Sequence, residues 1–275
     1  MSELLRTSGL TRHFGGVTAV DDVDFAIGDD ELCALIGPNG AGKTTFFDLL
    51  TGALSPSEGT VELHDGDGWR DLTDAALHET AAAGIHRSYQ ITNVFPTSTV
   101  LENVRVAAQA GGGDEGATGD SVRLWRNVRA FDAYYDEALS ILERVGLADE
   151  AETVAETLSH GEKRQLELAI ALAGDPDLLL LDEPAAGVSS ESVDEVVDLV
   201  REVASDHAVL LVEHNMDVVM DLAERVVVLH QGQVIADDDP TAVRENDRVQ
   251  EAYLGGYGAD DAADGSGDGD PEVSA

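Results

Sequence analysis

The segment GPNGAGKTT at residues 37–45 constrains this chain most, because it fits the pattern G-x-x-x-x-G-K-[S/T] between an apolar run and a helical pattern. Its glycines let backbone N–H groups surround a phosphate chain at a helix N-terminus, where the helix dipole favours anions. The Lys43 ammonium suits the terminal phosphates of a nucleotide, and the Thr44 hydroxyl suits a Mg²⁺ ion. The sequence therefore predicts a phosphate-binding loop made of Gly37, Pro38, Asn39, Gly40, Ala41, Gly42, Lys43, Thr44 and Thr45.

Two acidic residues, Asp182 and Glu183, directly follow the apolar run at 178–181. Strands often end at solvated acids, so this pair alone is a weak indication of a catalytic site. Beside a phosphate loop it becomes a strong one. There, Asp182 at the carboxyl edge of a sheet suits a Mg²⁺ ligand. The adjacent Glu183 suits a base that polarises an attacking water molecule.

Two further candidates lie at the ends of predicted elements. Ser159, in LSHGE at 158–162, comes at the start of a helical pattern, where serine is commonly an N-cap. A hydroxyl and free N–H groups at that position also form an anion site. His214 follows the predicted strand 208–213. The remaining histidines show no spacing typical of a metal site, so the sequence indicates no zinc.

Strand and helix patterns alternate along the chain, which predicts an α/β fold with a mainly parallel sheet and helices on both faces. Residues 91–165 are the exception, because they read as almost purely helical, and Thr99 with Glu102 forms a capping-box pair there. We therefore expect an inserted helical subdomain. Residues 255–275 hold six Gly and six acids with almost no large apolar side chain, which predicts a disordered acidic tail.

Acidic residues outnumber basic ones by 55 to 16, giving a net charge of −39. Such a charge excludes non-specific nucleic-acid binding, which needs a basic face. The scarcity of lysine, with only Lys43 and Lys163, together with the excess of aspartate resembles the surface of a protein from a salt-loving organism. A binding surface for a basic partner is the alternative, which the spread of the acids along the chain disfavours. The single cysteine, Cys33, excludes a disulfide framework, and its apolar neighbours predict a buried, inert thiol. With no signal peptide and no run of about 20 apolar residues, the sequence predicts a soluble cytosolic chain.

The order of the phosphate loop, Gln90, Leu-Ser-x-Gly-Glu, Asp182-Glu183 and His214 resembles an ABC-type nucleotide-binding domain over roughly residues 4–254. The resemblance implies a P-loop NTPase of ABC type, with an N-terminal antiparallel β part and a helical subdomain at about 91–165 inside an ATP-binding domain at 1–254. It also implies that the chain is an ATPase that uses ATP with Mg²⁺.

In that family two domains enclose two ATP molecules, so the resemblance assigns Ser159 and Gly161 to the γ-phosphate of the nucleotide that the partner subunit holds. Gln90 would reach Mg²⁺ and the attacking water. His214 would hold the γ-phosphate and orient the water together with Glu183. Phe14 matches the aromatic residue that stacks on adenine, with core packing as its alternative.

Two residues depart from the family pattern. His160 stands where the commonest signature has Gly, which puts a close backbone approach at that position in doubt. Ser189 stands where Asp is usual in the loop after Glu183, so either communication between subunits is weaker or the hydroxyl replaces the hydrogen bonds of the carboxylate.

Four further segments resemble one branch of the family, the larger ATPase of branched-chain amino-acid importers: residues 12–20, 182–187, 212–216 and 251–255. Importers of urea and short-chain amides share much of this pattern, and a soluble ABC ATPase without a permease is the alternative from another class. The importer resemblance implies a peripheral protein at the cytoplasmic face of the membrane. Its partners would be a second ABC ATPase subunit (homodimer or heterodimer), membrane permease subunits and, indirectly, an extracytoplasmic substrate-binding protein.

One basic segment stands out inside the helical region. On a helix, Arg123, Arg126 and Arg129 would share one face. We expect this face to contact lipid headgroups or the permease; pairing with acids of the same chain is the alternative.

Overall fold

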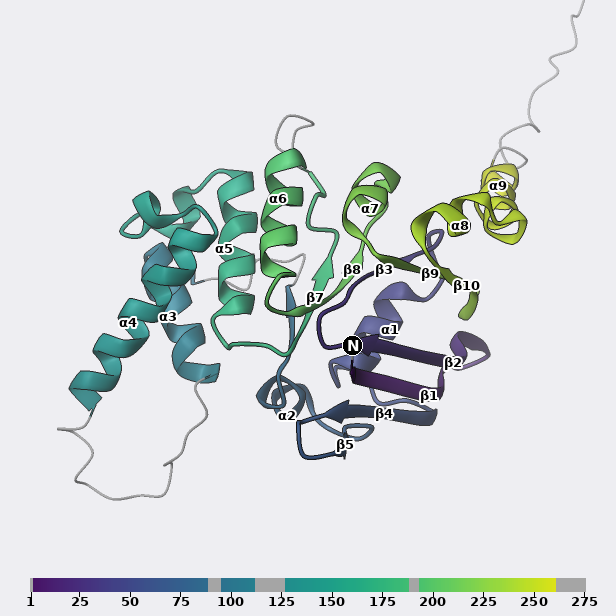
Figure 1. The fold of residues 1–275 in the computed structure, drawn as a ribbon, viewed down its shortest axis with the longest axis horizontal. Coiled ribbons are helices and arrows are strands. Elements are labelled where there is room, and N and C mark those ends of the chain that lie inside the picture. The colour runs from purple at the N-terminus through teal and green to yellow at the C-terminus, as the bar shows by residue number, and fades with distance from the viewer. Residues whose placement is uncertain (1, 89–94, 112–126, 188–192, 261–275) are drawn as a thin grey trace, which may run out of the picture.

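The computed structural model describes residues 2–88, 95–111, 127–187 and 193–260 (Figure 1). Gln90, Arg123, Arg126 and Ser189 lie outside these ranges, and so does the side chain of Arg129. The expectations for these five residues therefore stay predictions.

A six-stranded sheet forms the centre of the molecule, in the order β10-β9-β3-β8-β7-β6. All neighbouring pairs are parallel except β9 with β10, which are antiparallel. The short central strands are buried along their whole length, as expected for a sheet covered on both faces. The strands are β3 (Leu32–Ile36), β6 (Ile85–Ser88), β7 (Leu178–Asp182), β8 (Ala208–Val212), β9 (Arg225–His230) and β10 (Gln233–Asp238).

Alternate residues of these strands enter two different cores, because successive side chains of a strand point to opposite faces. Leu178 and Leu180 pack with helix α1 (Lys43–Leu50) and a four-stranded antiparallel sheet, β2-β1-β4-β5. Leu179 and Leu181 pack on the other side. The antiparallel strands are β1 (Glu3–Phe14), β2 (Val17–Gly28), β4 (Glu58–His64) and β5 (Trp69–Asp71). The helices of the other face are α5 (His160–Leu172), α6 (Val193–Val203), α7 (Met216–Leu222) and α8 (Pro240–Glu245).

The described residues between 95 and 165 hold helices and one isolated bridge, between Thr99 and Val154. They lie beyond the β6 end of the sheet, at the left of Figure 1. The predicted capping box is confirmed: Glu102 N donates to Thr99 Oγ1 at 3.1 Å, and Thr99 N donates to Glu102 Oε2 at 3.1 Å. The elements are α3 (Val100–Gly111), α4 (Asn127–Arg144) and the short 3₁₀ helices Ala148–Glu150 and Ala155–Thr157; α2 (Leu77–Ala82) precedes β6.

The structure differs from the sequence expectations at both ends. The hydrophobic pattern alone does not predict strand β1, because its pairing with β2 shifts register four times and Gly9 takes a positive φ of 57°, so its apolar residues do not alternate cleanly. The N-terminal antiparallel β part that the resemblance implies is present. Helix α9 (Asp247–Asp260) runs six residues into the segment predicted as a disordered tail. Buried Val249 and Ala252 anchor this helix, and extending a helix is easier than starting one.

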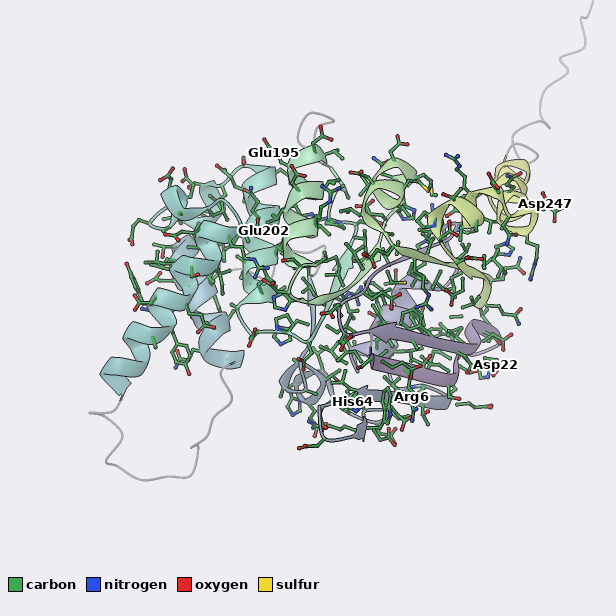
Figure 2. The ribbon with its side chains drawn as sticks, in the orientation of Figure 1. Arg6, Asp22, His64, Glu195, Glu202 and Asp247 are labelled. Carbon is green, nitrogen blue, oxygen red and sulfur yellow. The ribbon has the colours of Figure 1, made fainter. Side chains whose placement is uncertain are left out.

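Exposed acids occur on well-separated parts of the surface (Figure 2): Glu195 and Glu202 on α6, Asp22 on β2 and Asp247 at the start of α9. They do not gather on one face. Within the described ranges, no helix is both long and apolar enough to cross a membrane.

Cys33 lies fully buried in β3, and burial raises the pKa of its thiol far above the usual value. Since the thiolate is the reactive form, we expect Cys33 to resist an aromatic disulfide reagent at pH 8 in the native protein. Unfolding in guanidinium should release one thiol equivalent within minutes. Rapid stoichiometric reaction of the native protein would contradict the burial of Cys33.

Candidate functional site

The candidate site lies at the carboxyl edge of the central sheet, where β3, β8 and β7 end side by side. The phosphate loop follows β3, Asp182 and Glu183 close β7, and His214 follows β8. Polar groups from three segments therefore meet at one edge, where ligands commonly bind to open α/β sheets. They line a cavity of about 250 Å³, formed by Ala19, Asn39, Gly40, Ala41, Gly42, Lys43, Thr44, Thr45, Asp182, Glu183, Val212 and His214.

The shape of the loop depends on two glycines with positive φ. Gly37 has φ 153° and Gly42 has φ 108°. A Cβ atom at Gly37 would overlap the carbonyl oxygen of Leu229, and one at Gly42 would overlap that of Ala19. No other residue fits these positions without moving the backbone, so both glycines are required for the loop to pack against β9 and β2.

Lys43 begins helix α1 and is only 7% exposed. Its Nζ donates to Gly37 O at 2.7 Å and to Pro38 O at 3.2 Å. Burial lowers the pKa of Lys43 below its ordinary value, and the nearby carboxylates of Glu183 and Asp182 oppose that shift. The ammonium is thus held inside the loop, facing two carboxylates.

Glu183 and His214 contact each other across the cavity, with His214 Nε2 at 2.6 Å from Glu183 Oε1. The Glu183 backbone has φ 51°, a left-handed conformation that is costly for a residue with a Cβ. Two backbone contacts hold it there: Glu183 N donates to Val212 O at 2.8 Å, and Arg164 donates to Glu183 O at 3.0 Å. These contacts hold the Glu183 backbone in place, and His214 contacts its carboxylate.

Glu213 is a structural member of the site that the sequence reasoning did not assign. This buried carboxylate accepts from the backbone N–H of Ala185 at 2.8 Å and from that of His214 at 3.1 Å. It therefore fixes the loop after β7 relative to the loop after β8. Its only sequence signal is an acid directly before His214, after an apolar run.

Arg87 in β6 is a second residue that the sequence reasoning missed. Its side chain is 6% exposed and bridges two carboxylates, with Nη1 at 2.6 Å from Asp48 Oδ1 and Nη2 at 2.7 Å from Asp182 Oδ2. Burial opposes the charge of the guanidinium, but the hydrogen bonds to Asp182 and Asp48 outweigh it and raise the pKa of Arg87.

The donor atoms around the cavity fit Mg²⁺. Thr44 and Asp182 offer oxygen ligands, which a hard cation prefers, and both line the same cavity. Across the described residues, no group of three or more His, Cys, Asp or Glu side chains could hold a metal ion by itself.

Ser159 and Gly161 do not join this cavity; they line a separate one of about 360 Å³ beside α5 and α6. Ser159 is the N-cap of α5, in a reciprocal capping box with Glu162. A Cβ at Gly161 would meet no atom within 4 Å, so the backbone is open to approach there. The neighbouring His160 packs against Gly187, where an added Cβ would lie 3.0 Å from His160 Nε2.

Phe14 lies at the end of β1, and its side chain is 45% exposed. The alternative of core packing is therefore wrong. The guanidinium carbon of Arg12 lies 4.9 Å from the centre of the Phe14 ring. Phe14 is not among the residues that line the phosphate-loop cavity, so its contact with adenine stays a prediction.

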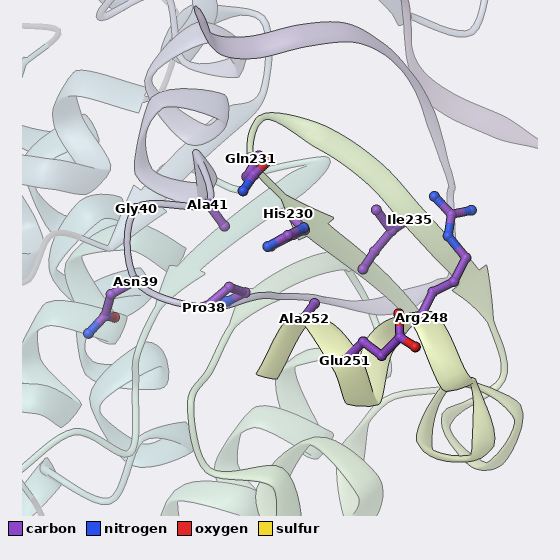
Figure 3. A pocket seen from close by; sticks show the side chains of 10 residues that line it. All are labelled: Pro38, Asn39, Gly40, Ala41, His230, Gln231, Ile235, Arg248, Glu251 and Ala252. Atoms are coloured by element: carbon purple, nitrogen blue, oxygen red, sulfur yellow. The ribbon is translucent and has the colours of Figure 1, made fainter. Parts of the chain in front are cut away.

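A larger cavity, of about 520 Å³, lies between the phosphate loop and helix α9 (Figure 3). Pro38 and Ala41 approach it from the loop, and Arg248, Glu251 and Ala252 from α9. Four residues of the phosphate loop line it, but Lys43, Asp182 and Glu183 do not. Burial raises the pKa of Tyr253, and a hydrogen bond with the Gly37 backbone partly opposes that shift. The C-terminal helix thus packs against the loop.

A phosphate loop that faces an acid–histidine pair across the edge of a parallel sheet defines a P-loop nucleotide hydrolase. The ABC transporter family matches residues 20–186, and the family described as branched-chain amino acid ATP-binding cassette transporter matches residues 233–259. The chain belongs to the ABC transporter family and is an ATP-binding ATPase.

Individual relatives agree with this assignment. The chain is 37% identical to the high-affinity branched-chain amino acid transport ATP-binding protein LivG of Escherichia coli, over 92% of this chain and 98% of that protein. It is equally similar to BraF of Pseudomonas aeruginosa, a protein of the same description, with the same coverage. Among solved structures, the ADP conformation of an ATP-binding cassette of an ABC transporter matches with a TM-score of 0.77 and 28% identity, covering 93% of this chain and all of that one. The predicted fold class is confirmed.

Proposed function

We propose that this chain powers the import of branched-chain amino acids through separate membrane permease subunits. The observation that carries the proposal is the match of residues 233–259 to the branched-chain amino acid cassette family. These residues form β10, α8 and most of α9, which packs against the phosphate loop. The names of the relatives LivG and BraF support the same substrate class. The chain would bind peripherally at the cytoplasmic face of the membrane.

We assign nucleotide binding to the loop amides, Lys43 and Thr45, with Phe14 against adenine. Lys43 would exchange its contacts with Gly37 O and Pro38 O for phosphate oxygens. Thr44 and Asp182 would hold Mg²⁺, with Gln90 as a further ligand. When bound, Mg²⁺ neutralises the charge that develops on the β- and γ-phosphates.

Glu183 serves as the base in this proposal. The oxygen of a water molecule attacks the γ-phosphorus, its proton passes to Glu183, and the bond between the γ-phosphorus and the β–γ bridging oxygen breaks to leave ADP. His214 Nε2, at 2.6 Å from Glu183 Oε1, would orient the carboxylate and hold the γ-phosphate. Gln90 would help to position the water.

A second ATPase subunit, identical or different, would complete the site. Ser159 and Gly161 lie apart from the Lys43 cavity of their own chain, which supports their assignment to a nucleotide held by the partner subunit. Closure of two such subunits would act on the permease through the helical subdomain at about 91–165, and an extracytoplasmic binding protein would deliver the substrate. Here Arg123, Arg126 and Arg129 would face the lipid headgroups or the permease.

The exposed acids suit a protein that works in high salt. At 1 M salt the Debye length is about 3 Å, so repulsion among dispersed surface charges is largely screened. The net charge of −39 and the scattered exposed acids of Figure 2 support this proposal.

Uptake of labelled leucine and labelled urea tests the substrate class. Cells lacking this chain should lose leucine uptake, and wild-type protein should restore it while Glu183→Gln should not. Loss of urea uptake alone would contradict the amino-acid proposal in favour of an amide importer. If neither uptake falls and the protein does not copurify with membranes, the chain acts as a soluble ATPase without a permease.

A further inference from the structure

Arg87 is a buried cation that connects Asp182 with helix α1, the helix that begins at Lys43. Ile85 and Arg87 lie on the same face of β6, since side chains alternate along a strand. Leu178, Leu180 and Asp182 share a face of β7 in the same way, and helix α1 covers that face. Strand β6 pairs in parallel with β7, which brings Arg87 beside the end of β7.

The two terminal nitrogens of the guanidinium contact carboxylates on two different elements. Nη2 contacts Asp182 Oδ2 at 2.7 Å on β7, and Nη1 contacts Asp48 Oδ1 at 2.6 Å on α1. The ring of Phe47, also on α1, lies 5.3 Å from the guanidinium carbon. Because the planar fork is rigid and charged, it holds Oδ2 of Asp182 in place and links it to Asp48 on α1.

We propose that Arg87 is a positioning residue for the divalent cation. Its guanidinium holds the Asp182 carboxylate in place and links it to α1 through Asp48. The inference rests on the proposed role of Asp182 as a Mg²⁺ ligand. Residues that orient metal ligands commonly change metal affinity by about 10- to 100-fold when they are replaced. A residue of this kind would affect nucleotide binding only through the metal, whereas Lys43 would contact the phosphates directly.

The test compares binding of a non-hydrolysable ATP analogue by calorimetry in EDTA and in Mg²⁺, using the full chain. For Arg87→Met we expect analogue affinity in EDTA close to that of wild type, and a gain in affinity on adding Mg²⁺ that is at least about tenfold smaller. Arg87→Lys keeps the charge but lacks the fork, so its Mg²⁺-dependent gain should lie in between. If Arg87→Met does not fold, the comparison of Arg87→Lys with wild type is the test.

Two further variants make the result specific. Arg225→Met is the matched control, because Arg225 also joins two carboxylates, Glu31 and Asp237, but lies at the start of β9, next to the opposite edge strand β10. It should keep the wild-type gain. Asp182→Asn should lose the gain. If Asp182→Asn loses it while both Arg87 variants keep it, Arg87 is only structural and the inference is overturned. If Asp182→Asn keeps it, the metal role of Asp182 fails and the inference fails with it, whatever the Arg87 variants do.

Discussion

Glu183→Gln should bind ATP as tightly as the wild-type chain while hydrolysing it about 10²- to 10⁴-fold more slowly, the usual loss when a general base is removed. The amide keeps the size of the side chain and can still contact His214, so the cavity keeps its shape. It cannot accept the proton of the attacking water, so the closed state persists. ATP turnover at saturating nucleotide gives the rate, and size-exclusion chromatography with ATP should show an accumulated dimer.

The matched control for this variant is Glu202→Gln, which makes the same chemical change on the exposed surface of α6. It should hydrolyse ATP at the wild-type rate and should not accumulate as a dimer. Turnover by Glu183→Gln at a similar rate would show that Glu183 is not the base, even if the dimer forms.

Lys43→Ala should lose most of its nucleotide affinity. Each charge-assisted hydrogen bond contributes about 1.5–3 kcal/mol, so loss of the ammonium corresponds to about 10- to 100-fold weaker binding or more. The backbone of the loop should survive the change, because its positive-φ glycines and their packing against Leu229 and Ala19 do not depend on Lys43. Calorimetric titration with ATP measures the loss.

The chain offers its own control for that experiment, because Lys163 is the only other lysine in the sequence. Lys163 is a residue of α5 whose Nζ donates to Glu156 O at 3.0 Å, away from the phosphate loop. Lys163→Ala should bind ATP like wild type. Wild-type affinity in Lys43→Ala would instead contradict the assignment of residues 37–45 as the nucleotide site.

Much of the candidate site could be predicted because its signals are local. The spacing from Gly37 to Thr45, and the acids at the end of β7, are read within a few residues. Arg87 could not be found in this way, because its partners Asp48 and Asp182 are 39 and 95 positions away in the sequence. Glu213 is similar, since its role depends on the Ala185 amide, 28 positions away.

The same distinction holds for the fold. The apolar runs of β3, β7 and β8 predict their strands because both faces of those strands are buried. Strand β1 shifts register four times against its partner β2, and a short window of its own sequence does not show where these shifts fall. The end of α9 depends on packing of Val249 and Ala252 against the rest of the domain, which composition alone does not reveal.

The left-handed backbone of Glu183 also bears on how this chain could be made more stable. At φ 51° a glycine would avoid the steric cost that a residue with a Cβ incurs, roughly 1–2 kcal/mol. A search for stabilising substitutions would therefore favour glycine at a position where the proposed chemistry needs a carboxylate. Stability and activity are in conflict at this single residue, so selection for thermal resistance alone would tend to remove the activity.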